Sequence, residues 1–251
     1  MKIIDESKSK LTKALIRVAP GTELRVGLEH IVNAKTGALI VIGDVTDISK
    51  VINGGFKLDC EFTSQKLYEL AKMDGAIVLD ENAGRILLAN VHLVPDSSLP
   101  TSETGMRHRT AERVARQSKA LVISISQRRE VVSLYLDDIK YALQDLRVVL
   151  VKGNQAMQTL EKYKSSLDQV LSSLNALEFE DLVALVDVST AIQRSQMVKR
   201  IAAEIQRYIW ELGSEGRLLR MQLDELMAGV QEDFLMLIKD YCRDVKKAKK
   251  V

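Results

Sequence analysis

The sequence carries three short polar segments whose residue types could do chemistry, and the first is Asp74-Gly75-Ala76, directly before the apolar run 76–79. A carboxylate at the start of a buried strand could hold a hard divalent cation or accept a proton. The glycine beside it would let a ligand approach the backbone. Because Asp-Gly is also a common turn, this segment alone favours a simple turn over a site.

The second segment runs from Gly105 to Thr110 and places Arg107, His108 and Arg109 where a loop meets a helix. Helix N-termini favour anions, so three basic side chains there oppose the usual preference for acids. The arrangement favours a bound polyanion such as a triphosphate. The alternative is an exposed basic face paired with Glu103 and Glu112, and we favour anion binding over it.

The third segment is the turn around Ser126, Arg128 and Arg129, between the apolar runs 121–125 and 131–136. Hydroxyl and guanidinium groups in a turn could cradle phosphate. A charged hairpin tip explains the same residues equally well. The sequence has no Walker loop, dinucleotide fingerprint, nucleophile elbow or HExxH, and its three histidines have no metal-ligand spacing.

The elements that must position these segments alternate between helical and strand patterns over the first 145 residues. Gly37 and Gly43 bound one buried strand, and the runs 76–79 and 85–93 predict a hairpin. Helices are expected at 7–18, 22–32, 63–72 and 107–118, and further strands at 121–125 and 131–136. Residues 141–151 fit either the end of the sheet or the start of a helix. The fold class predicted for 1–145 is therefore an α/β domain with a mixed central sheet flanked by helices.

From residue 154 the pattern is helical, and residues 146–251 are assigned to an all-α bundle. Further helices are expected at 178–190, 192–212, 215–228 and 230–243. A heptad seam about two and a half repeats long comprises Leu160, Tyr163, Leu167, Val170, Leu174 and Leu177. Because the seam is short, packing within the bundle is favoured over a free coiled coil.

The composition of the 251 residues excludes several classes of protein. Apolar residues make up 46% and charged residues 28%, which argues against disorder, and a net charge of +2 argues against a basic nucleic-acid coat. All three prolines lie in the first 100 residues. Cys60 and Cys242 suggest no disulfide framework, and no apolar run predicts a membrane span or signal peptide, so we expect a cytoplasmic protein. The basic tail 246–250 is interpreted as a solvated end.

Taken together, these segments are more specific than each alone. Residues 72–76, 90–95 and 103–113, with 19–22, 37–41 and 158–163, strongly resemble the bacterial diadenylate cyclases, and in particular the DNA integrity scanning family. The resemblance covers essentially the whole chain. It implies that two ATP molecules are condensed into the second messenger cyclic di-AMP, with release of two pyrophosphates and a requirement for Mg²⁺ or Mn²⁺. It also implies a site formed by two cyclase domains face to face, and hence a homo-oligomer, up to an octamer.

The resemblance also implies roles for individual residues. Asp74 matches the metal-binding aspartate that helps to activate the 3′-hydroxyl. Arg107, His108 and Arg109 match the motif around the phosphates, where they would offset developing charge. The remaining ATP-binding residues that it implies are Gly75, Ala76, Leu93, Thr104, Thr110, Ser126, Arg128 and Arg129.

The sequence departs from the family's pattern in two places. Met106 stands where many members have threonine, so one hydroxyl contact is absent. Members also continue into a helix-hairpin-helix DNA-binding domain, whereas this sequence ends at Val251, so DNA binding is not expected for it. An inactive ATP-binding oligomeric scaffold is the main alternative, and the intact Asp74 and Arg107-His108-Arg109 segments speak against it.

Overall fold

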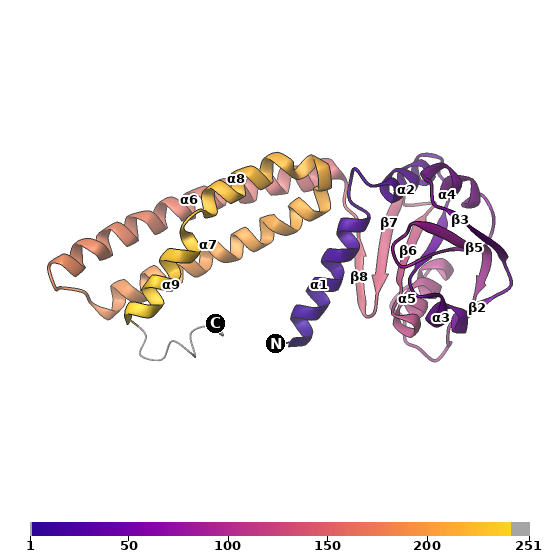
Figure 1. Ribbon diagram of the computed structural model, residues 1–251, viewed down its shortest axis with the longest axis horizontal. Helices are drawn as coiled ribbons and strands as arrows, with labels where there is room; N and C mark the ends of the chain where they lie inside the picture. The colour runs from indigo at the N-terminus through magenta and orange to yellow at the C-terminus, as the bar shows by residue number, and fades with distance from the viewer. Residues whose placement is uncertain (1, 242–251) are drawn as a thin grey trace. The chain divides into compact units, whose positions relative to one another are not determined.

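The computed structural model describes residues 2–241, with backbone only for residues 2–8 (Figure 1). It divides into two compact units, Met1–Asp145 and Leu146–Val251. Cys242 and the basic tail 246–250 lie outside the described residues, so the expectations for them stay predictions.

Eight strands form one mixed sheet within the described part of the first unit. Along the sheet their order is β2-β5-β4-β1-β6-β7-β8, and β3 pairs with β5. β1 pairs parallel with β4, and the other pairs are antiparallel. The strands are β1 (Ala38–Ile42), β2 (Ile52–Asn53), β3 (Phe56–Glu61), β4 (Ala76–Leu79), β5 (Arg85–Leu93), β6 (Leu121–Ser126), β7 (Val131–Leu136) and β8 (Ile139–Ala142).

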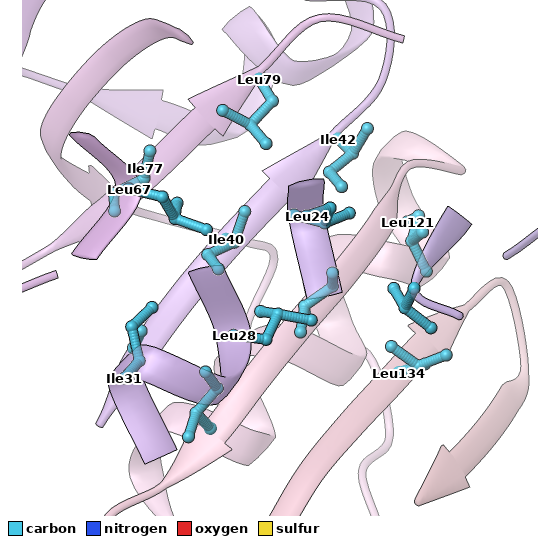
Figure 2. Close-up of a cluster of buried hydrophobic side chains, with 14 of the residues drawn as sticks. Leu24, Leu28, Ile31, Ile40, Ile42, Leu67, Ile77, Leu79, Leu121 and Leu134 are labelled. Atoms are coloured by element: carbon cyan, nitrogen blue, oxygen red, sulfur yellow. The ribbon is translucent and has the colours of Figure 1, made fainter. Parts of the chain in front are cut away.

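Helices cover both faces of this sheet, because the side chains of its central strands are buried on both sides. Ile40 and Ile42 of β1 pack with Leu28 of α2 (Glu23–Asn33) and Leu67 of α4 (Ser64–Leu70) in one cluster (Figure 2). α1 (Lys2–Arg17) adds to the same cluster. Each such buried side chain contributes roughly 1.5–3 kcal/mol.

The opposite face of the sheet is covered by α3 (Val45–Ile48), the 3₁₀ turn η1 (Ser49–Val51) and α5 (Met106–Ser118) (Figure 1). Leu39 and Val41 of β1 pack there against Ala111 of α5. The predicted class, a mixed sheet flanked by helices, is confirmed. Gly54 and Gly55, which both have positive φ angles, form the turn that joins β2 to β3.

The structure adds elements that the apolar pattern did not predict. Most side chains of β3 are exposed, so the strand shows no apolar alternation, and Asp59 has a φ of 46° where the β3–β5 register shifts. The ambiguous stretch 141–151 holds both expected elements, because β8 ends at Ala142 and α6 (Leu146–Phe179) begins four residues later.

The second unit consists of helices, as predicted: α6, α7 (Leu185–Leu212), α8 (Arg217–Met227) and α9 (Val230–Tyr241), with the 3₁₀ turn η2 (Gly213–Gly216) between α7 and α8. Leu160, Leu167 and Leu174 of the heptad seam are at most 2% exposed. They pack with side chains of α7 in the same clusters, so the seam is packing within the bundle.

The helix predicted over 178–190 is wrong at residues 180–184, because 178–179 belong to α6 and 185–190 to α7. α6 ends at Phe179, Asp181 has a φ of 60°, and α7 begins at Leu185, where the Asp187 carboxylate accepts a hydrogen bond from the Ala184 N–H at 3.1 Å. Most apolar side chains of this stretch, including Leu182 (65% exposed), are exposed, whereas Val188 is buried within α7. Within residues 2–241 no helix is both long and apolar enough to cross a bilayer.

Candidate active site

The three polar segments meet at one edge of the sheet. β1 and β4 run parallel, so their first residues lie at the same edge, and β5 and β6 run antiparallel to them and end there. The register pairs Ala76 with Val91 and Ala38 with Ile125. Asp74-Gly75 precedes β4 and Ser126 ends β6, so both lie at this edge. Ala76, Leu93 and Ala111 belong to one buried cluster, which places the start of β4 and the end of β5 on the face that α5 covers.

Asp74 lies in the turn between α4 and β4 and is exposed. Its side chain has no hydrogen bond or ion pair with any side chain that the structure describes. Gly75 has a φ of 87°, and a Cβ there would lie 2.9 Å from the Val91 carbonyl oxygen. The absence of a side chain at Gly75 therefore allows the backbone of β5 to pass close by. From the sequence, the same glycine was expected to leave space for a ligand. Ala76 is 1% exposed, so it can offer a ligand little besides backbone.

α5 begins without the groups that usually cap a helix. Its N-cap is Gly105, which has no side-chain acceptor, and its first turn contains no acidic residue. Arg109 donates through its backbone N–H to the Gly105 carbonyl at 2.9 Å and through Nη2 to the Thr104 carbonyl at 3.2 Å. Its Nε is buried and has no acceptor within the described residues. Met106 is 76% exposed, and Thr110 is half-buried one turn along.

Arg107 reaches from the start of α5 to the start of β1. A Cβ on Gly37 would fall well inside van der Waals contact with Arg107 Nη1 and would lie 3.1 Å from the Ile125 carbonyl oxygen. The guanidinium therefore lies against the backbone that joins the sheet edge to β1. The apolar pattern marked Gly37 as a strand boundary and did not predict this approach of Arg107, which is 70 residues away in the sequence.

Glu103 and Glu112, the acids considered as partners for the basic start of α5, form no ion pair with Arg107 or Arg109. Glu112 accepts from Thr101 Oγ1 at 2.5 Å and pairs with Arg116 at 3.0 Å, one turn further along the helix. Glu103 pairs with Lys140 at 2.5 Å. The alternative of a basic face neutralised by these two acids is therefore wrong, and Arg107 and Arg109 keep their charges available.

The third segment forms the turn between β6 and β7. Ser126 is the last residue of β6, and its Oγ accepts from the Arg129 N–H at 3.3 Å. Arg128 and Arg129 are exposed. Among the side chains that the structure describes, residues 9–241, none forms an ion pair with Arg107, Arg109, Arg128 or Arg129. Four uncompensated guanidinium groups at one edge attract a polyanion.

His108 is at one end of a partly buried chain of polar contacts that the sequence did not predict. Its Nδ1 lies 2.9 Å from the Tyr135 hydroxyl on β7, and that hydroxyl donates to Glu103 Oε1, also at 2.9 Å. Burial lowers the pKa of His108, and the positive charges of Lys140, Arg129 and Arg107 lower it further, against the opposing effect of Glu103.

The other two members of the network have perturbed pKa values as well. Burial raises the pKa of Glu103, but hydrogen bonds from Lys140 and Tyr135 outweigh it, so the pKa lies below the usual value. Burial, and then the hydrogen bond to Glu103, raise the pKa of Tyr135. The one signal for this network in the sequence was a tyrosine within an apolar strand, since a buried tyrosine hydroxyl usually has a partner.

A divalent cation would find few protein ligands at this edge. The described residues contain no group of three or more His, Cys, Asp or Glu side chains that could hold a metal ion. Mg²⁺ is often bound by one or two carboxylates together with substrate phosphates. An exposed, unpaired Asp74 beside a polyanion site fits that mode.

Comparison with known proteins identifies the family. Residues 25–139 match the family model described as DisA bacterial checkpoint controller nucleotide-binding, and residues 143–251 match the one for its linker region. The DNA integrity scanning protein DisA of Symbiobacterium thermophilum is 58% identical over 236 residues, which are 94% of this chain and 67% of that protein. The protein of the same name from Clostridium acetobutylicum is 54% identical over 242 residues, which are 96% and 68% of the two chains.

A solved structure, DacA from Staphylococcus aureus, is 20% identical and aligns with 56% of this chain and 90% of its own, with a TM-score of 0.39. The chain spans about two thirds of the length of the curated relatives. The resemblance in the sequence is thus confirmed, and the chain belongs to the DNA integrity scanning (DisA) family of diadenylate cyclases.

Proposed function

We propose that this chain condenses two ATP molecules into cyclic di-AMP. The 3′-oxygen of each ATP attacks the α-phosphorus of the other, forming two P–O bonds, breaking the two bonds to pyrophosphate and releasing two hydroxyl protons. The observation that carries the proposal is that an unpaired carboxylate and four unpaired guanidinium groups lie at one sheet edge. Phosphoryl transfer depends on this combination of positioning and charge stabilisation.

The residues take separate parts in this reaction. Asp74 would hold Mg²⁺ or Mn²⁺, which when bound supplies Lewis-acid polarisation of the 3′-hydroxyl and the phosphates. Arg107 and Arg109 stabilise the charge that develops on the α-phosphate and the leaving pyrophosphate. Arg128, Arg129 and Ser126 take the rest of the triphosphate.

The nucleoside lies against the ends of the strands. Gly75, Ala76 and Leu93 address it through backbone groups, because Ala76 and Leu93 are buried. Thr104 and Thr110 contribute at the ribose or the phosphates.

Two cyclase domains face each other in the active form. The exposure of Asp74, Arg107 and Arg128 supports this arrangement, because one domain alone leaves these groups open to water. Cyclic di-AMP has two-fold symmetry, and a two-fold interface supplies each half of the product with the same residues. A cytoplasmic homo-oligomer, up to an octamer, follows as part of the proposal, and the prediction for DNA binding stays a prediction.

The experiment is an incubation with ATP and either Mn²⁺ or Mg²⁺, with Asp74→Asn as the test variant. We expect Asp74→Asn to lose cyclic di-AMP synthesis and to keep the melting temperature, because its side chain is exposed and unpaired. Asp224→Asn, at an exposed position on α8, is the matched control and should keep full activity. Normal synthesis by Asp74→Asn would remove the central assignment, and ATP binding without turnover in either metal would favour the inactive scaffold.

A further inference from the structure

The hydrogen bonds around Glu103 determine where the protons of this partly buried network lie. The Glu103 side chain is 13% exposed, and its Oε1 receives both Lys140 Nζ at 2.5 Å and the Tyr135 hydroxyl at 2.9 Å. Its pKa is lowered, since the hydrogen bonds from Lys140 and Tyr135 outweigh its burial, so Glu103 is a carboxylate near neutral pH and can only accept. The proton between Tyr135 and Glu103 therefore belongs to the tyrosine.

The single proton of the Tyr135 hydroxyl is used in that bond, so only its oxygen lone pairs remain for His108. The imidazole Nδ1 lies 2.9 Å away and must therefore carry a proton itself. Three segments besides α5 hold this chain of bonds: the loop before α5 carries Glu103, β7 carries Tyr135 and β8 carries Lys140. These residues of the sheet and of the loop before α5 thereby hold the imidazole ring of His108 in one orientation.

In a neutral imidazole with the proton on Nδ1, the other nitrogen is an acceptor. Burial and the charges of Lys140, Arg129 and Arg107 lower the pKa of His108, against the opposing charge of Glu103, and so favour the neutral form. Phosphate oxygens require donors, which the neighbouring arginines supply. An acceptor at Nε2 instead suits a hydroxyl or another hydrogen-bond donor of the nucleotide.

We infer that Glu103 and Tyr135 are positioning residues that hold His108 in the Nδ1–H tautomer, so that Nε2 faces the nucleotide as an acceptor and not as a cation. This inference rests on the proposed function for its effect on catalysis, but the tautomer itself does not depend on turnover. It changes the role expected for His108, since the sequence grouped it with Arg107 and Arg109 as a charge stabiliser.

The first test is the ¹⁵N spectrum of the imidazoles in the full chain, which has only three histidines. His108→Gln assigns the His108 signal by its loss. We expect the wild-type ring to carry its proton on Nδ1, and Tyr135→Phe to shift it towards the Nε2–H form. A wild-type ring protonated on Nε2 would overturn the inference, whatever the activity.

The second test is steady-state kinetics of cyclic di-AMP synthesis. Tyr135→Phe should lower kcat about 10-fold or more and change the KM for ATP by less than about threefold, because the ring is misoriented while the arginines remain. Tyr208→Phe on α7 is the matched control, because Tyr208 also donates to a glutamate, Glu204, at 2.9 Å. Full kcat in Tyr135→Phe, with the tautomer unchanged, would contradict the inference.

Glu103→Gln is a second variant that keeps an oxygen to accept from Tyr135 but removes the charge. Since Glu103 raises the pKa of His108, its neutralisation should move the acidic limb of kcat/KM to lower pH while the tautomer persists. A purely structural role would lower activity without moving that limb, and this result would count against the inference. If the wild type makes no cyclic di-AMP, the proposed function fails. The tautomer measurement still decides whether Glu103 and Tyr135 hold His108 in the Nδ1–H form.

Discussion

Replacing Gly37 by alanine should separate activity from stability at this site. The new Cβ would clash with Arg107 Nη1, so the guanidinium must withdraw by ~1 Å or more to restore van der Waals separation. The other close atom, the Ile125 carbonyl oxygen at 3.1 Å, needs only a small adjustment. Because a misplacement of about 1 Å can cost on the order of 10²-fold in rate, we expect activity to fall by about 10- to 100-fold.

The same substitution should leave the fold intact. Gly37 lies outside the left-handed region of φ, so alanine is allowed there, and the variant's lower unfolded-state entropy favours folding by roughly 0.4–1 kcal/mol. That gain is comparable to the small strain at Ile125, so the melting temperature should change by only a few degrees. Gly84→Ala is the matched control, because a Cβ there meets no atom within 4 Å, and it should change neither quantity.

The assay is initial-rate synthesis of cyclic di-AMP with Gly37→Ala, Arg107→Ala and the double variant. If the loss acts through Arg107, the double variant should be no slower than Arg107→Ala alone, since coupled residues are non-additive. Full activity in Gly37→Ala would refute the reasoning. An additional loss in the Arg107→Ala background would also refute it, because the glycine would then act by another route.

Three further predictions follow from the structure. Leu167→Ala should lower the free energy of unfolding by ~2–5 kcal/mol, because Leu167 is 1% exposed, whereas Leu185→Ala, at an 85% exposed position, should change it little; denaturant titration measures both. The lowered pKa of His108 means that the unfolded chain binds its proton more readily, so stability should fall as pH drops below about 6.5, and thermal melts of His108→Gln should lack this part of the fall. The lowered pKa of Glu103 likewise makes stability fall as the pH drops below the ordinary pKa of a glutamate. Specific activity should fall on dilution if two domains form each site, and a concentration-independent rate down to nanomolar protein would contradict that arrangement.

The sequence could predict the sheet and the segments at its edge because both rest on local patterns. Buried strands such as β1 and β6 are short apolar runs with turn residues beside them, and the motif residues lie at the ends of these runs. β3 escaped because its side chains are mostly exposed, so no apolar alternation marks it. The break at 180–184 was missed for the opposite reason, since its apolar residues suggest a helix, yet Leu182 is 65% exposed and packing does not support a helix there.

The contacts that organise the site could not be predicted in the same way. Tyr135 meets His108 only because the β6–β7 pairing and the packing of α5 bring residues 27 positions apart together. Arg107 meets Gly37 only because both lie at the edge where β1 begins. Such contacts depend on strand register and helix placement, which a single sequence does not encode as a local pattern.

The most direct test of the central claim is the product of an ATP incubation, identified by mass and by pyrophosphate release. The purified chain with ATP and Mn²⁺ or Mg²⁺ should yield cyclic di-AMP and two pyrophosphates for each product molecule. ATP recovered unchanged in both metals, or converted only to a linear dinucleotide or to ADP, would contradict the assignment of a complete diadenylate cyclase site to this sheet edge.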